Sequence, residues 1–105
     1  MNTEFEINSL HYRIKKMNAI EMLAIQSQIS FDSADESYAC YSQILERCEV
    51  QCNNDWIPVK VKGKEIYYPV GLEDDLEVVQ LIIKHFIDWL KDVFTKSNES
   101  NSKTE

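Results

Sequence analysis

Three cysteines and two histidines are the residues of this chain best suited to chemistry. They are Cys40, Cys48, Cys52, His11 and His85. Such residues could bind zinc, but a zinc site needs about four ligands at short spacings, and no CxxC pair occurs here. Cys–His nucleophilic catalysis would need Cys48 or Cys52 beside His85. We interpret Cys40 and Cys48 as packing residues on one helical face and His85 as a solvated side chain, so the pattern predicts no metal site and no cysteine catalysis.

Carboxylates and glycines bear on the remaining catalytic classes. Glu73, Asp74 and Asp75 could act as acid–base or metal-binding groups, but they stand at an expected helix start, where carboxylates are favoured electrostatically. Gly63 and Gly71 are the sequence's two glycines, so it contains no glycine-rich loop for phosphates or dinucleotides. We therefore expect a protein that is not an enzyme and takes no cofactor.

A short basic stretch allows two interpretations. Lys60, Lys62 and Lys64 alternate along an expected hairpin, with Tyr67 and Tyr68 nearby, and interleaved cations and aromatic rings can hold single-stranded nucleic acid. Lysines also guard sheet edges against association. The formal net charge of −7 favours the second interpretation, because an acidic chain repels polyanions. We expect neither nucleic acid nor a membrane as a partner.

The length and the amino-acid composition indicate one small soluble domain. The chain has 105 residues, of which 44% are apolar and 28% charged. The N-terminal sequence is polar and acidic and does not resemble a secretory signal. The odd number of cysteines, without a disulfide-scaffold spacing, suits free thiols in a reducing cytoplasm.

The elements that would position these residues follow from periodicity and capping. Alternation over Phe5–Ile7 and Tyr12–Ile14 predicts antiparallel strands joined at Asn8-Ser9. Capping boxes that begin at Asn18 and Ser33 predict two helices. The residues that these helices are expected to bury are Ile20, Leu23, Ala24 and Ile29 in the first, and Tyr38, Tyr41, Ile44, Leu45 and Cys48 in the second.

A second hairpin is predicted before the C-terminal helix. Residues 57–61 alternate, Lys62-Gly63-Lys64 makes the turn, and residues 65–68 return. Pro58 cannot donate a ladder hydrogen bond, so its strand either lies at a sheet edge or starts after Pro58. The order ββααββα predicts an α+β fold with two β-hairpins and three helices. We expect residues 1–96 to form one domain and residues 97–105, which lack apolar side chains, to form a disordered tail.

The stretch from Leu72 to Phe94 predicts a long amphipathic helix at the centre of the fold. Its apolar residues recur at steps of three and four and cover about half of the circumference. They include Leu72, Leu76, Val79, Ile83, Phe86, Leu90 and Val93, with Ile83 in the middle of the expected core.

Two surfaces of this helix are candidates for protein binding. One is Leu81, which is expected to lie alone on the polar face; the other is the flank of Val78, Ile82 and Trp89. A partner helix would bury these residues in a helix-in-groove manner, and self-association is an alternative use of the flank. The competing interpretation is that the flank packs on the Tyr38–Cys48 helix and that Leu81 is an ordinary exposed leucine.

Two stretches resemble the small tail assembly chaperones of long-tailed bacteriophages and prophages of Gram-positive bacteria. They are EFEINSLHYRIKKMNAIEMLAIQSQI, residues 4–29, and WIPVKVKGKEIYYPVGLEDDLEVVQLIIKHFIDWL, residues 56–90. The first hairpin turn departs from the family in having Asn-Ser where Asn-Gly is expected. The resemblance implies a non-enzymatic protein of the bacterial host cytoplasm that binds the tape measure protein and keeps it soluble during tail assembly. It also implies the tail tube protein as a second partner, recruited in some members by a frameshifted longer form.

Acidic composition leaves other function classes open. The chain could be an acidic adaptor, or a nucleic-acid mimic that inhibits a DNA-binding partner, although −7 on 105 residues is a modest charge for a mimic. Tape measure protein recovered with the chain would support the chaperone, whereas a nuclease or polymerase would support the mimic.

Overall fold

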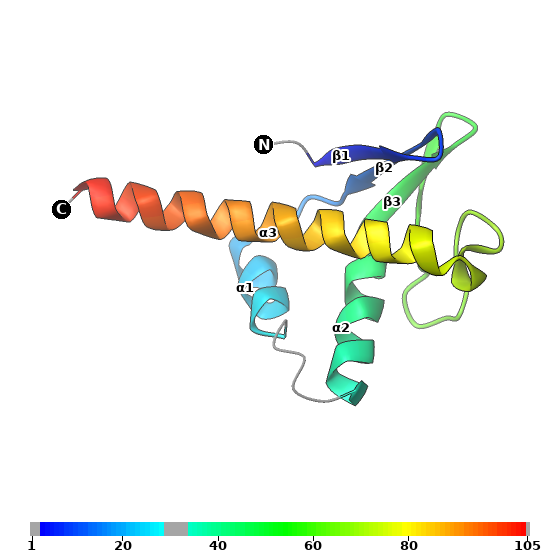
Figure 1. Cartoon of the computed structure of the whole chain (residues 1–105), viewed down its shortest axis with the longest axis horizontal. Helices are drawn as coiled ribbons and strands as arrows, with labels where there is room; N and C mark the ends of the chain where they lie inside the picture. The colour runs from blue at the N-terminus through cyan, green and yellow to red at the C-terminus, as the bar shows by residue number, and fades with distance from the viewer. Residues whose placement is uncertain (1–2, 29–33, 105) are drawn as a thin grey trace.

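The computed structural model describes residues 3–28 and 34–104, and describes side chains for residues 3–28 and 40–95. Within this part of the chain a four-stranded antiparallel sheet carries three α-helices and a 3-10 turn, so the expected α+β fold of two hairpins and three helices is confirmed (Figure 1). The elements are β1 (Glu4–Ile7), β2 (Leu10–Ile14), α1 (Ala19–Ser27), α2 (Ala34–Glu46), β3 (Cys48–Cys52), β4 (Asp55–Pro58), the 3-10 turn η1 (Leu72–Asp74) and α3 (Leu76–Thr104).

The sheet has the order β1-β2-β3-β4. Two-residue turns close both of its hairpins, at Asn8-Ser9 and at Asn53-Asn54, and all four turn residues have positive φ angles between 51° and 71°. This left-handed conformation matches the twist of the strands, and asparagine tolerates it better than most residues. The hairpin that the sequence predicts at Asn8-Ser9 is therefore confirmed.

The second hairpin differs from the prediction. Cys48, which we expected at the end of a helix, begins β3 and pairs with Ile14, while Val50 pairs with Tyr12. The helix ends earlier, at Glu46, because Cys48 and Val50 alternate toward the core as a strand requires. The predicted pairing of residues 57–61 with residues 65–68 is reduced to a single isolated bridge, Lys60 with Tyr67.

The two faces of the sheet carry different side chains. Phe5 pairs with Tyr12 on the face toward α3, where their rings stack with centroids 5.5 Å apart. On the opposite face Arg13 forms an ion pair of 2.7 Å with Glu49, and its guanidinium lies 4.3 Å from the ring centroid of Trp56. This polar face is typical of an antiparallel sheet with one face toward solvent. Pro58 ends β4, an edge strand, as we predicted.

The first helix begins where the sequence predicts but buries a different side. The side chain of Asn18 accepts a hydrogen bond of 2.9 Å from the backbone N–H of Glu21 and so caps α1. Ile20 and Leu23, which we expected to be buried, are 78% and 56% exposed, and Ala24 is also exposed. The buried residue of α1 is instead Ile25, with Met22 partly buried; Met17, just before the Asn18 cap, is also buried.

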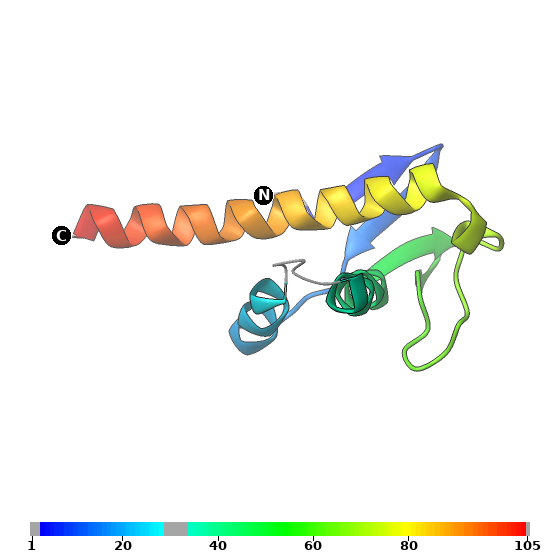
Figure 2. The ribbon, with the colours of Figure 1, turned by 60° about the horizontal axis from the view of Figure 1, so that its bottom comes forward.

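The physical reason for this difference is that α1 makes a small contact at the side of α2 (Figure 2), and Met22 and Ile25 are its residues that pack into the core. Met22 and Ile25 fill this contact, so Ile20 and Leu23, on other sides of the helix, remain exposed to solvent. Ile29, which we expected to be buried, and the predicted cap at Ser33 lie outside the described residues. The side chain of Tyr38, also expected in the core, lies outside the described side chains. Of the other residues expected in the second helix's core, Ile44 and Leu45 are buried, whereas Tyr41 is 38% exposed.

The long helix begins four residues later than predicted. Leu72 lies in η1, and Asp75 leaves the helical conformation before α3 starts at Leu76. The Asp75 carboxylate accepts a hydrogen bond of 3.2 Å from the backbone N–H of Val78, so one of the three acidic residues caps α3. At its other end the helix continues to Thr104, past residue 96, where we expected regular structure to stop. Figure 1 shows this C-terminal part projecting beyond the other elements.

Candidate protein-binding site

The binding residues that the sequence predicts do not form one exposed surface. Val78 and Ile82 are 5% and 0% exposed and belong to the core between α3, α2 and the sheet. Trp89 is half-buried and lies beside Phe86, with ring centroids 5.8 Å apart. Leu81, which we expected alone on the polar face, is also half-buried and packs against the core. In this conformation a partner cannot reach Val78 or Ile82, so the predicted flank is a core surface.

The orientation of α3 explains this outcome. Val78, Ile82, Phe86 and Leu90 recur every four residues and form the buried line of the helix. Leu76, which the sequence assigns to the core stripe, is 70% exposed. Because the apolar sector of α3 is wide, the helix could bury apolar side chains at several rotations about its own axis. The periodicity of the sequence does not determine which of these rotations the fold adopts.

Contacts with β1 fix this rotation. The exposed side chain of His85 stacks on Phe5 at 4.5 Å between ring centroids, with an interplanar angle of 11°. This contact holds the His85 flank of α3 against the edge strand. Ile82 and Phe86 then point into the core, and the opposite flank of the apolar sector turns outward.

The outward flank forms a shallow apolar groove with α2. Its volume is about 460 Å³, and its apolar wall consists of Leu76, Val79, Ile83, Ile87 and Tyr41. We call these five residues the α2–α3 groove. The four α3 residues are spaced by three, four and four positions, which aligns them along one side of the helix. Val79, Ile83 and Ile87 are half-buried, so the groove is part of the core edge and is also open to solvent.

Polar residues of both charge signs border this groove. Gln80, Lys84, Asp88 and Lys91 lie along its α3 side. An apolar floor with a charged rim suits a protein helix whose own apolar residues recur every three or four positions. Sequence reasoning missed this surface because it placed Leu76 and Ile83 in the centre of the core. The signal that could have found it is the width of the apolar sector, which exceeds the area one packing contact covers.

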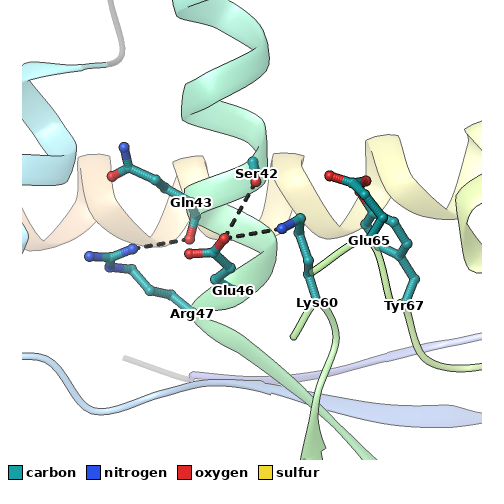
Figure 3. Close-up of polar contacts among 7 residues, drawn as sticks. All are labelled: Ser42, Gln43, Glu46, Arg47, Lys60, Glu65 and Tyr67. Carbon is teal, nitrogen blue, oxygen red and sulfur yellow. Dashed lines mark hydrogen bonds and ion pairs between the residues drawn. The ribbon is translucent and has the colours of Figure 1, made fainter. Parts of the chain in front are cut away.

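The expected basic patch does not assemble. Lys60 is 4% exposed, and its Nζ lies 3.2 Å from Oε2 of Glu46 (Figure 3). Lys62 and Lys64 are exposed. The ammonium group that we expected at the hairpin surface is turned toward the end of α2 because a carboxylate is available there. The three lysines therefore do not form one exposed row.

Cys40 lies in α2, and Cys48 and Cys52 lie at the two ends of β3. Cys40 and Cys48 are buried and Cys52 is partly exposed. Burial raises the pKa of the Cys48 thiol to about 12 and also raises the pKa of Cys40, so both stay protonated at neutral pH. Among the described side chains no group of three or more His, Cys, Asp or Glu residues is arranged to hold a metal ion.

Comparison of the chain with known protein families, with curated proteins and with solved structures found no match. In the part of the chain that the structure describes, no helix combines the length and the apolar character needed to cross a membrane.

Proposed function

We propose that the protein is a tail assembly chaperone of a bacteriophage or prophage, and that it holds helical segments of the tape measure protein in the α2–α3 groove. The groove carries this proposal because it presents a row of solvent-accessible apolar side chains at helical spacing, bordered by charged residues. The resemblance of residues 4–29 and 56–90 to this class is the second support for the proposal, because it supplies the identity of the partner.

The energetics of such a complex rest on moderate apolar burial. Leu76 is the most exposed residue of the groove, and covering one such side chain stabilises a complex by up to about 2 kcal/mol. The other groove residues are less exposed and would each add less, which gives binding that is firm enough to prevent aggregation and weak enough to be reversed when the tail tube polymerises. The net charge of −7 would keep the loaded complex soluble in the host cytoplasm.

Co-expression with the tape measure protein tests the proposal. We expect the wild-type chain to keep the tape measure protein in the soluble fraction and to elute with it from a size-exclusion column. The double variant Leu76→Glu/Ile87→Glu should remain folded, because Leu76 is exposed and Ile87 only half-buried, and should release the tape measure protein into the insoluble fraction.

Leu23→Glu on α1 is the matched control. It makes the same chemical change at an apolar residue that is 56% exposed and lies outside the groove, so it should leave solubilisation unchanged. If the groove variant solubilises the tape measure protein as well as wild type does, the groove is not the binding surface. Failure of the wild-type chain to bind tape measure protein, with capture of a nuclease or polymerase instead, would favour the nucleic-acid mimic.

A further inference from the structure

A basic cavity of about 590 Å³ lies between the end of β2, the C-terminal end of α2 and the chain after β4. It is lined by five of the chain's eleven Lys and Arg residues, namely Lys15, Lys16, Arg47, Lys60 and Lys62. The carboxylates that line it are Glu21 and Glu46. Five cations against two carboxylates leave a local charge of +3 in a protein whose total charge is −7. This concentration of positive charge distinguishes the cavity from the rest of the molecule.

Specific bonds hold the three segments around this cavity. The backbone N–H of Lys15 donates a hydrogen bond of 2.8 Å to the carbonyl oxygen of Arg47, which joins the end of β2 to the turn after α2. The ion pair of Lys60 with Glu46 joins the chain after β4 to the same end of α2 (Figure 3). The basic side chains are therefore gathered by the fold from positions up to 47 residues apart in sequence, between Lys15 and Lys62.

The cations of the cavity are unevenly matched by carboxylates. Glu46 already accepts a hydrogen bond from Lys60 at 3.2 Å. Lys15, Lys16 and Lys62 are exposed and have no carboxylate oxygen within 4.0 Å among the described side chains. These like charges repel one another, and an anion placed among them would relieve that repulsion.

Arg47 adds directional donors at the wall of the cavity. One of its terminal nitrogens donates a hydrogen bond of 3.2 Å to the carbonyl oxygen of Gln43 (Figure 3). Its Nε–H is buried and meets no acceptor within the described residues. A guanidinium has five N–H donors in a fixed plane, which suits the oxygens of a phosphoryl group.

We infer that this cavity binds a small molecule that carries a phosphoryl group. A phosphoryl dianion balances a local charge of +3 better than a single carboxylate does, and the cavity has the volume of an ordinary small-molecule site. Met17 and Pro58 also line the cavity and provide apolar contact for the rest of such a ligand. A long polyanion fits less well, because the acidic surface beyond the cavity repels it. The inference does not depend on the proposed chaperone function.

Titration of the ¹⁵N-labelled full chain with sodium pyrophosphate, at constant ionic strength, tests this inference by NMR. The backbone amide signals of Lys16, Arg47 and Lys62 should shift and reach saturation. Those of Lys84 and Lys91 on α3 should stay in place, because these residues lie on the rim of the α2–α3 groove and not in the basic cavity.

Charge-removing variants then locate the site. Lys16→Gln and Lys62→Gln should each weaken pyrophosphate binding by about fivefold, the effect of one charge about 4 Å away in water. Both side chains are exposed, so the fold should persist, which the dispersion of the NMR signals reports directly. Lys64→Gln is the matched control, since Lys64 is exposed, two residues from Lys62 and outside the cavity, and it should bind like wild type.

Three results would overturn the inference. The first is a titration in which the shifts grow without saturation. The second is an equal loss of affinity in Lys64→Gln and Lys62→Gln, which would show that net charge and not the cavity attracts the anion. The third is binding of succinate as tight as that of pyrophosphate, which would reject the assignment to a phosphoryl group.

Discussion

The ammonium group of Lys60 lies 3.2 Å from the carboxylate of Glu46, with the lysine side chain 4% exposed and the glutamate side chain 17% exposed (Figure 3). This pair connects the C-terminal end of α2 to the chain that follows β4. Removing water from a charge is costly, so each member depends on the other for compensation. The unequal exposure of the two side chains means that their loss should have unequal effects.

Glu46→Gln should lower the free energy of unfolding by about 2 to 4 kcal/mol, because it leaves the lysine charge buried without its counter-charge. Lys60→Met should cost less, since the remaining carboxylate is partly exposed and can be hydrated. Urea denaturation of both variants measures the difference. The double variant Glu46→Gln/Lys60→Met serves as the control and should be more stable than Glu46→Gln alone. If Lys60→Met is the more damaging change, the lysine charge is better solvated than its burial indicates.

Ile82 and Ile83 are adjacent on α3 but have different roles. Ile82 is fully buried, so Ile82→Asp should place a charge in the core and lower the free energy of unfolding by more than about 4 kcal/mol. Ile83, which the sequence placed in the core, lies in the α2–α3 groove with its side chain partly exposed. Ile83→Asp should therefore cost only about 1 to 2 kcal/mol. Thermal or urea denaturation compares the two, and equal losses would contradict the observed rotation of α3.

Local signals in the sequence predicted local structure well. The Asn8-Ser9 turn, the Asn18 cap and the edge position of Pro58 depend on a few neighbouring residues, and the structure confirms each of them. The α+β class followed from the order of the elements, which is also a local property of the chain. The expected chaperone function has no such local test and stays a prediction.

Features that depend on distant residues were not predictable in the same way. Cys48 fits a helix stripe with Cys40, and only its pairing with Ile14 shows that it belongs to a strand. Lys60 resembles a surface lysine until Glu46 is placed beside it. The rotation of α3 depends on contacts such as that of His85 with Phe5, residues at opposite ends of the chain. Both candidate sites combine such distant residues, which is why the sequence did not reveal them.

Cys48 should make the protein less stable at alkaline pH. Its thiol has an ordinary pKa of 9.0, and burial raises this pKa to about 12 in the folded chain. Below pH 9.0 both states hold the proton, so this group contributes no pH dependence. Between pH 9.0 and about 12 the unfolded chain loses the proton first. The free energy of unfolding should therefore fall by up to about 1.4 kcal/mol per pH unit.

Urea denaturation from about pH 8 to about pH 10.5 tests this linkage. Cys48→Ala should be less stable than wild type at the lower pH, because it leaves a small cavity, but its stability should fall less steeply as pH rises. Cys52→Ala is the control for removing a thiol at a partly exposed position. Identical slopes for wild type and Cys48→Ala would show that the thiol is not protected from solvent. Loss of partner binding in a cysteine variant that remains folded would contradict the structural role we assign to the thiols.

The C-terminal end of α3 should be dispensable for folding. The helix continues to Thr104, but SNESNSKTE at residues 97–105 has no apolar side chain that could stabilise a packed helix end. Truncation after Lys96 should leave the thermal midpoint within about 2 °C of that of the full chain, because the buried residues of α3 end at Leu90 among the described side chains. Circular dichroism should show a small loss of helical signal if the residues removed are helical in solution. A truncation after Leu90, which also removes the partly buried Phe94, is the control and should lower the midpoint clearly. If the shorter truncation lowers it as much, the polar end of α3 contributes to folding and the domain does not end at residue 96.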